Sequence, residues 1–174
     1  MQFEACCVHL QHIFYFFTRL SPAKVRVNVN EIIANIETGG GVHNTFVTPD
    51  GRYAVGGMIG ASEIIAIDTE TDEVVFELNI PYSQNPTTGG VRPLTFSTNE
   101  DGSTRSLLVN VGGWHGFWEY DWDTQELMNK ISPPADSWDR MDQTADGIQS
   151  APSHGVVVLP DHSQVWHSSR ATSH

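Results

Sequence analysis

The segment "GGVHNTFVTPDGRYAVGG", residues 40–57, decides the fold because it places a tight turn between two alternating runs. Valine, phenylalanine and tyrosine alternate with small or polar residues on both sides of Pro-Asp-Gly, which is the pattern of two β-strands. Proline presets the first corner of such a turn, and glycine accepts the positive φ of a later corner. The segment therefore predicts a β-hairpin, and its meaning depends on whether it recurs.

The hairpin recurs at two further places in the chain. "SHGVVVLPDHSQVW", residues 153–166, aligns without a gap 111 positions later, with His154 on His43 and Asp161 on Asp50. A looser copy, "VRPLTFSTNEDGSTRSLLV", occupies residues 91–109 and keeps the Asp-Gly pair. Three copies of one hairpin indicate an internal repeat.

A second element repeats between these hairpins. "EIIAIDTETDEVVFEL", residues 63–78, aligns with "GFWEYDWDTQELMNKI", residues 116–131, at an offset of 53, and partially with "VRVNVNEIIANI", residues 25–36. Each copy has an alternating run, a polar turn and a second apolar run that follows a glutamate. One repeat therefore holds four strands. They are expected at 42–48, 52–58, 62–68 and 73–80, then at 92–98, 106–111, 116–122 and 126–131, and finally at 154–159 and 164–168.

Four antiparallel strands per unit, with a period of roughly 40–60 residues, are typical of β-propeller blades. The prediction is an all-β fold, an incomplete ring of about three blades. A continuous β-sandwich is the structural rival, but it gives no reason for such close internal copying. The expected organisation is an atypical leader at 1–24, disordered or a short helix, followed by a partial propeller at 25–174. The propeller is expected to contain a blade tail at 25–38, blades at 42–80 and 91–131, a loop at 132–152 and a half blade at 153–174.

Residues 47–57 together with residues 63–78 resemble a blade of the YVTN-type β-propeller repeat proteins, a WD40-like and quinoprotein-like group. In those repeats a Pro-Asp-Gly hairpin joins the first two strands and an "IDT.T..V" run marks the third and fourth. The resemblance covers roughly residues 25–170. It implies a propeller scaffold that serves binding proteins, surface proteins and several enzymes. The resemblance is also compatible with an extracellular or periplasmic location.

The number of blades raises the question of how their faces are covered. Closed propellers typically have about four to eight blades. An incomplete ring leaves two apolar blade faces without a neighbour. Three explanations stay open: the chain is a fragment of a longer propeller, copies of it self-associate through the exposed blade faces, or it forms an open stack.

Composition excludes several classes of partner. The chain has 9 lysines and arginines against 21 aspartates and glutamates, a net charge of −12, whereas nucleic acids and anionic membranes require clustered cations. No run approaches the ~20 apolar residues of a membrane span. The leader lacks the basic front and uninterrupted apolar middle of a secretory signal. Nucleophile-elbow, phosphate-loop and paired-cysteine motifs are absent from the sequence.

Histidines are the first candidates for a site. His43 and His154 occupy equivalent positions at the start of the innermost strand, by the expected channel mouth, and the middle copy has Arg92 there. Converging imidazoles would bind a transition metal, so His43 and His154 are the metal candidates. The simpler explanation is a histidine that bonds a loop carbonyl and fixes the register of the blade. The predicted ligand-binding set is His43, Arg92, His115 and His154.

An aromatic patch, "VGGWHGFWEYDWD" at residues 111–123, is the second candidate. Trp114, Trp118 and Trp122 would form a platform for a sugar ring or a cation, or else fill the space between blades. In the first case the acids that flank the platform, Glu119 and Asp121, would contribute to the site. The loop at 132–152 carries four aspartates, but their spacing does not match an EF-hand loop.

Strong scaffold signals without catalytic motifs favour a non-enzymatic propeller module that binds a protein or a small ligand on its loop face. No cofactor is predicted beyond the transition metal considered at the histidines. The alternative that the resemblance implies is a subunit or fragment of a propeller enzyme. Such an enzyme would be lactonase-like or a quinone- or metal-dependent oxidoreductase, acting through His43, Arg92 and His154.

Overall fold

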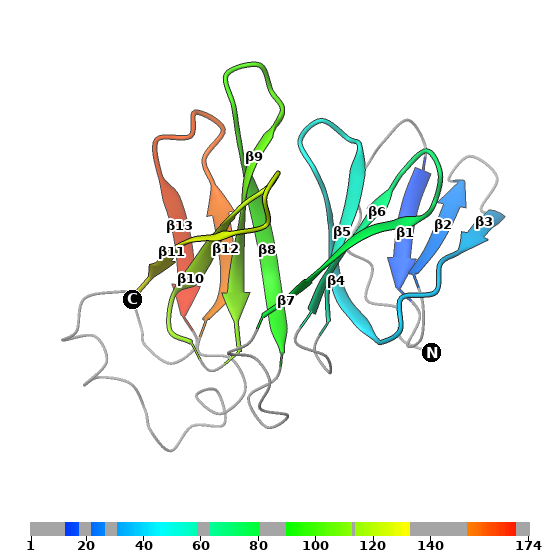
Figure 1. The fold of residues 1–174 in the computed structure, drawn as a ribbon, viewed down its shortest axis with the longest axis horizontal. Helices are drawn as coiled ribbons and strands as arrows, with labels where there is room; N and C mark the ends of the chain where they lie inside the picture. The colour runs from blue at the N-terminus through cyan, green and yellow to red at the C-terminus, as the bar shows by residue number, and fades with distance from the viewer. Residues whose placement is uncertain are drawn as a thin grey trace.

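The structure is a computed structural model that describes residues 13–17, 22–26, 31–58, 63–80, 90–112, 114–132 and 153–169. Every regular element in this part of the chain is a β-strand, so the all-β prediction is confirmed. Figure 1 shows the strands gathered into successive sheets that do not close into a ring. None of the described residues belongs to a helix that could cross a membrane.

Four antiparallel sheets follow one another along the chain, each with its strands in sequence order. The first sheet contains β1 (Ile13–Phe17), β2 (Pro22–Arg26) and β3 (Glu31–Asn35). The second contains β4 (Val42–Val47), β5 (Tyr53–Met58), β6 (Glu63–Asp68) and β7 (Val74–Asn79). The third contains β8 (Val91–Thr98), β9 (Thr104–Val111), β10 (Phe117–Asp121) and β11 (Leu127–Ile131), and the last is a hairpin of β12 (Ser153–Val158) and β13 (Val165–Ser169). The expected strands of the repeat are confirmed to within two residues at each end.

The leader differs from its prediction. Residues 13–17, "IFYFF", form β1 and pair with β2, so the expectation of disorder or a short helix is wrong for these five residues. Aromatic and β-branched residues favour strands, and here a partner strand is available. The first sheet consequently begins upstream of the boundary expected at residue 25. The rest of the leader before residue 13 lies outside the described residues, as do residues 133–152 of the predicted loop.

The hydrogen-bond register repeats with the sequence. β2–β3, β6–β7 and β10–β11 each contain one irregularity, a β-bulge that leaves one residue of the second strand unpaired. These bulges lie at Lys24/Val25, Ala66/Ile67 and Glu119/Tyr120. Their spacing is that of the sequence repeat, which identifies the first sheet as the counterpart of β5, β6 and β7.

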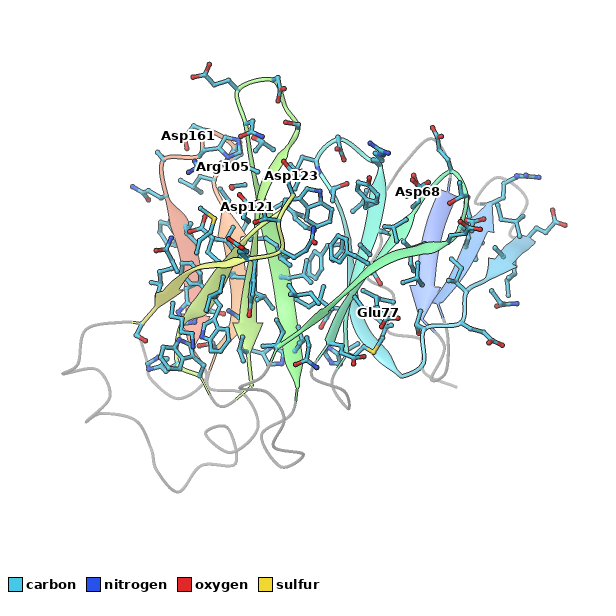
Figure 2. All side chains as sticks on the ribbon, in the orientation of Figure 1. Asp68, Glu77, Arg105, Asp121, Asp123 and Asp161 are labelled. Atoms are coloured by element: carbon cyan, nitrogen blue, oxygen red, sulfur yellow. The ribbon has the colours of Figure 1, made fainter. Side chains whose placement is uncertain are left out.

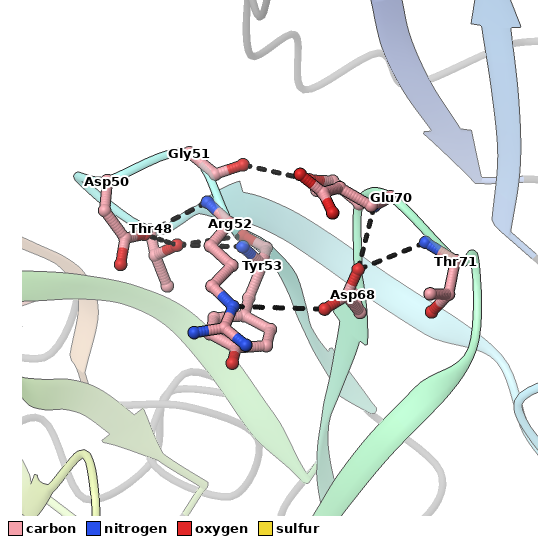
Figure 3. Close-up of polar contacts among 9 residues, drawn as sticks. Thr48, Asp50, Gly51, Arg52, Tyr53, Asp68, Glu70 and Thr71 are labelled. Carbon is pink, nitrogen blue, oxygen red and sulfur yellow. Dashed lines mark hydrogen bonds and ion pairs between the residues drawn. The ribbon is translucent and has the colours of Figure 1, made fainter.

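The turns repeat as well. The hairpin turns place Gly51, Gly102 and His162 at positive φ, at 76°, 85° and 57°. In each of these turns an aspartate accepts a hydrogen bond from the backbone amide two residues later, as Asp50 does from Arg52 at 3.0 Å (Figure 3). Left-handed backbone suits glycine, yet the last copy keeps the same turn with histidine. Conserved geometry across non-identical residues confirms the repeat.

Aspartate also organises the second kind of turn. The amides of Glu70 and Thr71 donate to Asp68 Oδ1 at 2.8 and 3.1 Å, as Figure 3 shows. These two hydrogen bonds are the main reason why the pKa of Asp68 lies below its usual value. Asp121 accepts from Asp123 and Thr124 in the same way in the third sheet. The polar hairpin tips expected from the sequence are thus capped by their own aspartates.

The sheets stack through their apolar faces. β4 and β5 contact β8, and β12 contacts β8 and β9, so the first strands of successive units are neighbours. The core between the second and third sheets contains Val55, Ile64, Leu94, Val109, Trp118, Tyr120 and Trp122 among its buried residues. The opposite face of the second sheet buries Ile36, Val42, Met58, Ile65 and Ile67. The second sheet is therefore buried on both faces, as expected for an inner blade.

The first sheet is tied to the second by a buried cation. Lys24, 7% exposed, donates from Nζ to Asp72 Oδ1 at 2.8 Å and to the carbonyl oxygen of Thr69 at 2.9 Å. At the other end of the stack, Val157 and Trp166 pair across β12 and β13 and are 52% and 62% exposed. Self-association through such a face stays a prediction.

Candidate functional site

The channel-mouth residues occupy the second positions of β4, β8 and β12, as the repeat requires. His43 and His154 are both half-buried, and Nδ1 of His43 contacts Oδ1 of its neighbour Asn44. The side chain of Arg92 lies outside the described residues. Within the described ranges no group of three or more His, Cys, Asp or Glu side chains is arranged for a metal ion. The metal site at His43 and His154, and the enzyme alternative that depends on it, stay predictions.

His115 differs from the other members of that set. It lies in the connection from β9 to β10, is 1% exposed, and packs its ring 6.1 Å from the ring of His167 on β13. The structure thus brings His115 to a histidine that sequence reasoning did not single out. The pKa of His167 is lowered by its burial and, secondarily, by the proximity of His115.

The predicted aromatic patch divides between core and edge. Trp122 is 8% exposed and lies 5.5, 5.2 and 5.6 Å from the rings of Tyr53, Phe76 and Phe96, measured between centroids. Trp118 is 2% exposed, and Nζ of Lys130 lies 3.9 Å from the centre of its ring. These two indoles occupy the space between the second and third sheets, and the cation over Trp118 comes from the chain itself.

Trp114 lies at the edge of that core. Its ring centroid is 6.0 Å from that of Trp118, and its Nε1 donates to the carbonyl oxygen of Ile131 at 3.3 Å. A hollow of about 530 Å³, lined in part by Trp118, opens between β7 and the outer strands of the third sheet. Burial raises the pKa of Tyr120, which lines that hollow, to about 12, so its hydroxyl stays protonated. The lining there is mostly apolar.

A second groove lies on the opposite face of the third sheet, where it meets the last hairpin. Its volume is about 340 Å³. Leu108, Phe117 and Ile131 form the apolar side contributed by the third sheet, and Val158 and Val165 form the side contributed by the hairpin. The groove combines these apolar walls with a carboxylate, Glu119, whose surroundings are unusual.

A chain of hydrogen bonds fixes Glu119 across the whole third sheet. Ser106 Oγ donates to Glu119 Oε1 at 2.8 Å, and Asn129 Nδ2 donates to Oε2 at 2.8 Å. Because Ser106 gives its hydrogen to Glu119, the 2.6 Å contact between Ser97 Oγ and Ser106 Oγ has Ser97 as donor. The chain runs from β8 to β11, one residue per strand. Both carboxylate oxygens are therefore held by neutral donors, and within the described residues Glu119 has no ion-pair partner.

The positive charge that lines this groove lies near negative charges other than Glu119. Arg105 lines the groove, and Figure 2 shows it at the same end of the sheets as Asp121, Asp123 and Asp161. Hydrogen bonds from Thr124, with a smaller effect of the Arg105 charge, lower the pKa of Asp121. The positive charge of Arg105 thus has an ionised carboxylate beside it, whereas the hydrogen bonds to Glu119 come from the neutral side chains of Ser106 and Asn129.

The sequence predicts Glu119 only as an acid that flanks the tryptophans, not as the centre of a groove on the other face of the sheet. A signal was present, because Glu119 lies between Trp118 and Tyr120 on one strand. Alternation places it on the face opposite the aromatic core, where β12 and β13 pack. The sequence alone does not reveal that Ser106 and Asn129, on the two neighbouring strands, donate hydrogen bonds to Glu119.

Comparison with known proteins supports the fold alone. No family model and no curated protein matches this chain. Among solved structures, it is similar to hydrazine synthase of Kuenenia stuttgartiensis, a β-propeller-containing protein, with a TM-score of 0.65 and 15% sequence identity. The likeness covers 90% of this chain and 38% of that one. With its four-stranded antiparallel units in an unclosed arc, the chain has a partial β-propeller fold.

Proposed function

We propose that this chain is a non-enzymatic β-propeller repeat module that binds a small organic cation, an ammonium group on an aliphatic frame. The binding site is the groove between the third sheet and the last hairpin. The observation that carries the proposal is the carboxylate of Glu119, which two neutral donors hold at 2.8 Å and which forms no ion pair with any described residue.

The chemistry of the groove suits such a ligand. An ionised carboxylate attracts an ammonium more strongly when apolar walls exclude part of the water, and Leu108 and Val165 supply such walls. The net charge of −12 favours the approach of a cation over that of an anion. A volume of about 340 Å³ is that of a small ligand pocket.

The hydrogen-bond chain adds preorganisation. Ser106 and Asn129 hold Glu119 in place before a ligand arrives, so binding does not have to immobilise a free carboxylate. Reduced ordering on binding converts directly into affinity. Ser106 and Asn129 are neutral, so they do not cancel the negative charge with which Glu119 attracts a cation.

Calorimetric titration of the full chain with hexylammonium tests the proposal. We expect saturable binding that weakens about tenfold or more in Glu119→Gln, since a hydrogen bond to a charged group contributes about 1.5–3 kcal/mol. Hexanol, which has the same chain without the charge, should bind at least about tenfold more weakly for the same reason. Glu126→Gln, an exposed glutamate in a turn, is the matched control and should leave binding unchanged. Equal binding of hexanol, or unchanged binding by Glu119→Gln, would refute the assignment.

A further inference from the structure

A histidine from the connection between β9 and β10 meets a histidine of β13 between the third sheet and the last hairpin. His115 is 1% exposed and His167 is half-buried; their ring centroids are 6.1 Å apart and their planes are inclined by 51°. The ring of Phe117 lies 6.3 Å from that of His167. Neither histidine belongs to the groove at Glu119 as it is lined above.

The separation of the rings suits one shared metal ion. A metal lies about 2.0–2.1 Å from a ligating imidazole nitrogen, and that nitrogen lies roughly 1 Å from the ring centroid. Two imidazoles on one ion therefore have centroids no more than about 6.4 Å apart, and about 5 Å at a tetrahedral angle. The observed 6.1 Å falls inside this limit and corresponds to a wide angle at the metal.

Two buried polar atoms, one on His167 and one on a residue that bonds to the connection carrying His115, have no hydrogen-bond partner among the described residues. Nε2 of His167 is buried and has no hydrogen-bond partner among the described residues. Oδ1 of Asn110 is in the same condition, and Asn110 is 0% exposed. Its Nδ2 donates to the carbonyl oxygen of Gly116, the residue after His115, at 3.3 Å. Buried polar atoms in native proteins nearly always bond to protein, water or an ion. His167 Nε2 and Asn110 Oδ1 are therefore both able to bind an ion.

The connection that carries His115 is held firmly. The amide of Gly116 donates to Ser153 Oγ, a fully buried hydroxyl on β12, at 2.7 Å. Gly116 has a φ of 129°, and a Cβ there would lie 1.9 Å from the carbonyl oxygen of Ile131. Such a fixed backbone positions the imidazole before any ion binds, which favours a defined site.

We propose that His115 and His167 bind one late first-row transition-metal ion, such as Zn²⁺, Ni²⁺ or Cu²⁺, between the third sheet and the last hairpin. Imidazole nitrogen is a preferred ligand of these ions, whereas Ca²⁺ and Mg²⁺ prefer oxygen. Asn110 Oδ1 or water completes the coordination. This site is distinct from the one expected at His43 and His154, and a bound ion would join the last hairpin to the third sheet.

The test is titration of the chelator-treated full chain with Cu²⁺, followed by calorimetry and electron paramagnetic resonance. We expect one ion per chain and hyperfine coupling to two imidazole nitrogens. His167→Ala should weaken binding well beyond tenfold, because loss even of an outer-shell partner costs about 10- to 100-fold. His162→Ala, which alters an exposed turn histidine, is the matched control and should bind like the parent chain.

Two outcomes would overturn the site. Absence of stoichiometric binding in the parent chain would overturn it, as would unchanged affinity in His167→Ala. A double variant, His43→Ala with His154→Ala, separates the two metal sites. Binding lost in that variant and kept in His167→Ala would assign the ion to the channel mouth. Should His167→Ala fail to fold, the two-nitrogen signature of the parent chain, kept in the double variant, still decides the question.

Discussion

Replacement of Trp122 by alanine tests how the second and third sheets pack. The indole is 8% exposed and lies 5.5, 5.2 and 5.6 Å from the rings of Tyr53, Phe76 and Phe96. Tyr53 and Phe76 belong to the second sheet and Phe96 to the third, so Trp122 contacts both sides of this core. Its removal leaves a cavity that neither sheet can fill without moving the other.

The expected loss follows from that burial. Truncation of a buried tryptophan or phenylalanine to alanine costs about 3–5 kcal/mol of unfolding free energy, and three aromatic contacts place Trp122 in the upper part of that range. With a urea dependence of about 1–3 kcal/mol per molar, the unfolding midpoint should fall by roughly 2 M. Far-ultraviolet circular dichroism is the suitable probe, because the substitution removes a fluorophore.

Trp166 supplies the matched control, since it is a tryptophan that is 62% exposed. Trp166→Ala should change the unfolding free energy by no more than about 0.5 kcal/mol. If Trp122→Ala costs less than about 1 kcal/mol, or no more than Trp166→Ala, the two sheets do not pack through this core.

Two further predictions concern the backbone and the turns. Gly116→Ala should destabilise the chain clearly more than Gly102→Ala in urea unfolding: both positions have positive φ, but an added Cβ meets the Ile131 carbonyl oxygen at 1.9 Å in the first and nothing within 4 Å in the second. Equal losses would mean that strained φ alone matters at Gly116. Because the folded-state pKa of Asp68 lies below its usual value of 3.8, its stabilisation is present above that value and is lost as the pH falls through the folded-state pKa. Asp68→Asn should therefore flatten the acid side of the stability–pH curve, and an unchanged curve would contradict the assigned turn hydrogen bonds.

The repeat was readable because its information is local. Asp50 and Gly51 specify one turn by their own conformational and hydrogen-bonding preferences, and the alternation on either side specifies the strands. The strand β1 could not be predicted from local sequence in the same way. "IFYFF" has no alternation, and its strand depends on pairing with β2, an interaction that residues 13–17 do not reveal by themselves.

The candidate sites show the same division. Sequence reasoning found the unusual segment around Trp118 but not the role of Glu119, because that role comes from Ser106 and Asn129 on the two neighbouring strands. The sequence predicts His115 near the channel mouth, but its contact with His167 could not be predicted, because that contact depends on how the last hairpin packs. The stacking of the sheets and the register of their strands determine which side chains meet. Neither can be predicted from the sequence of one segment alone.

Hydrogen exchange measured strand by strand by mass spectrometry is the decisive test of whether successive blades stack face to face. β5 and β6 have neighbours on both sides within the second sheet and are largely buried, whereas β7 and β11 form outer edges and β11 is exposed along its length. If the blades stack in this way, the amides of β5 and β6 should exchange far more slowly than those of β7 and β11. Exchange in β5 and β6 as fast as in the edge strands would contradict the stacked-blade structure.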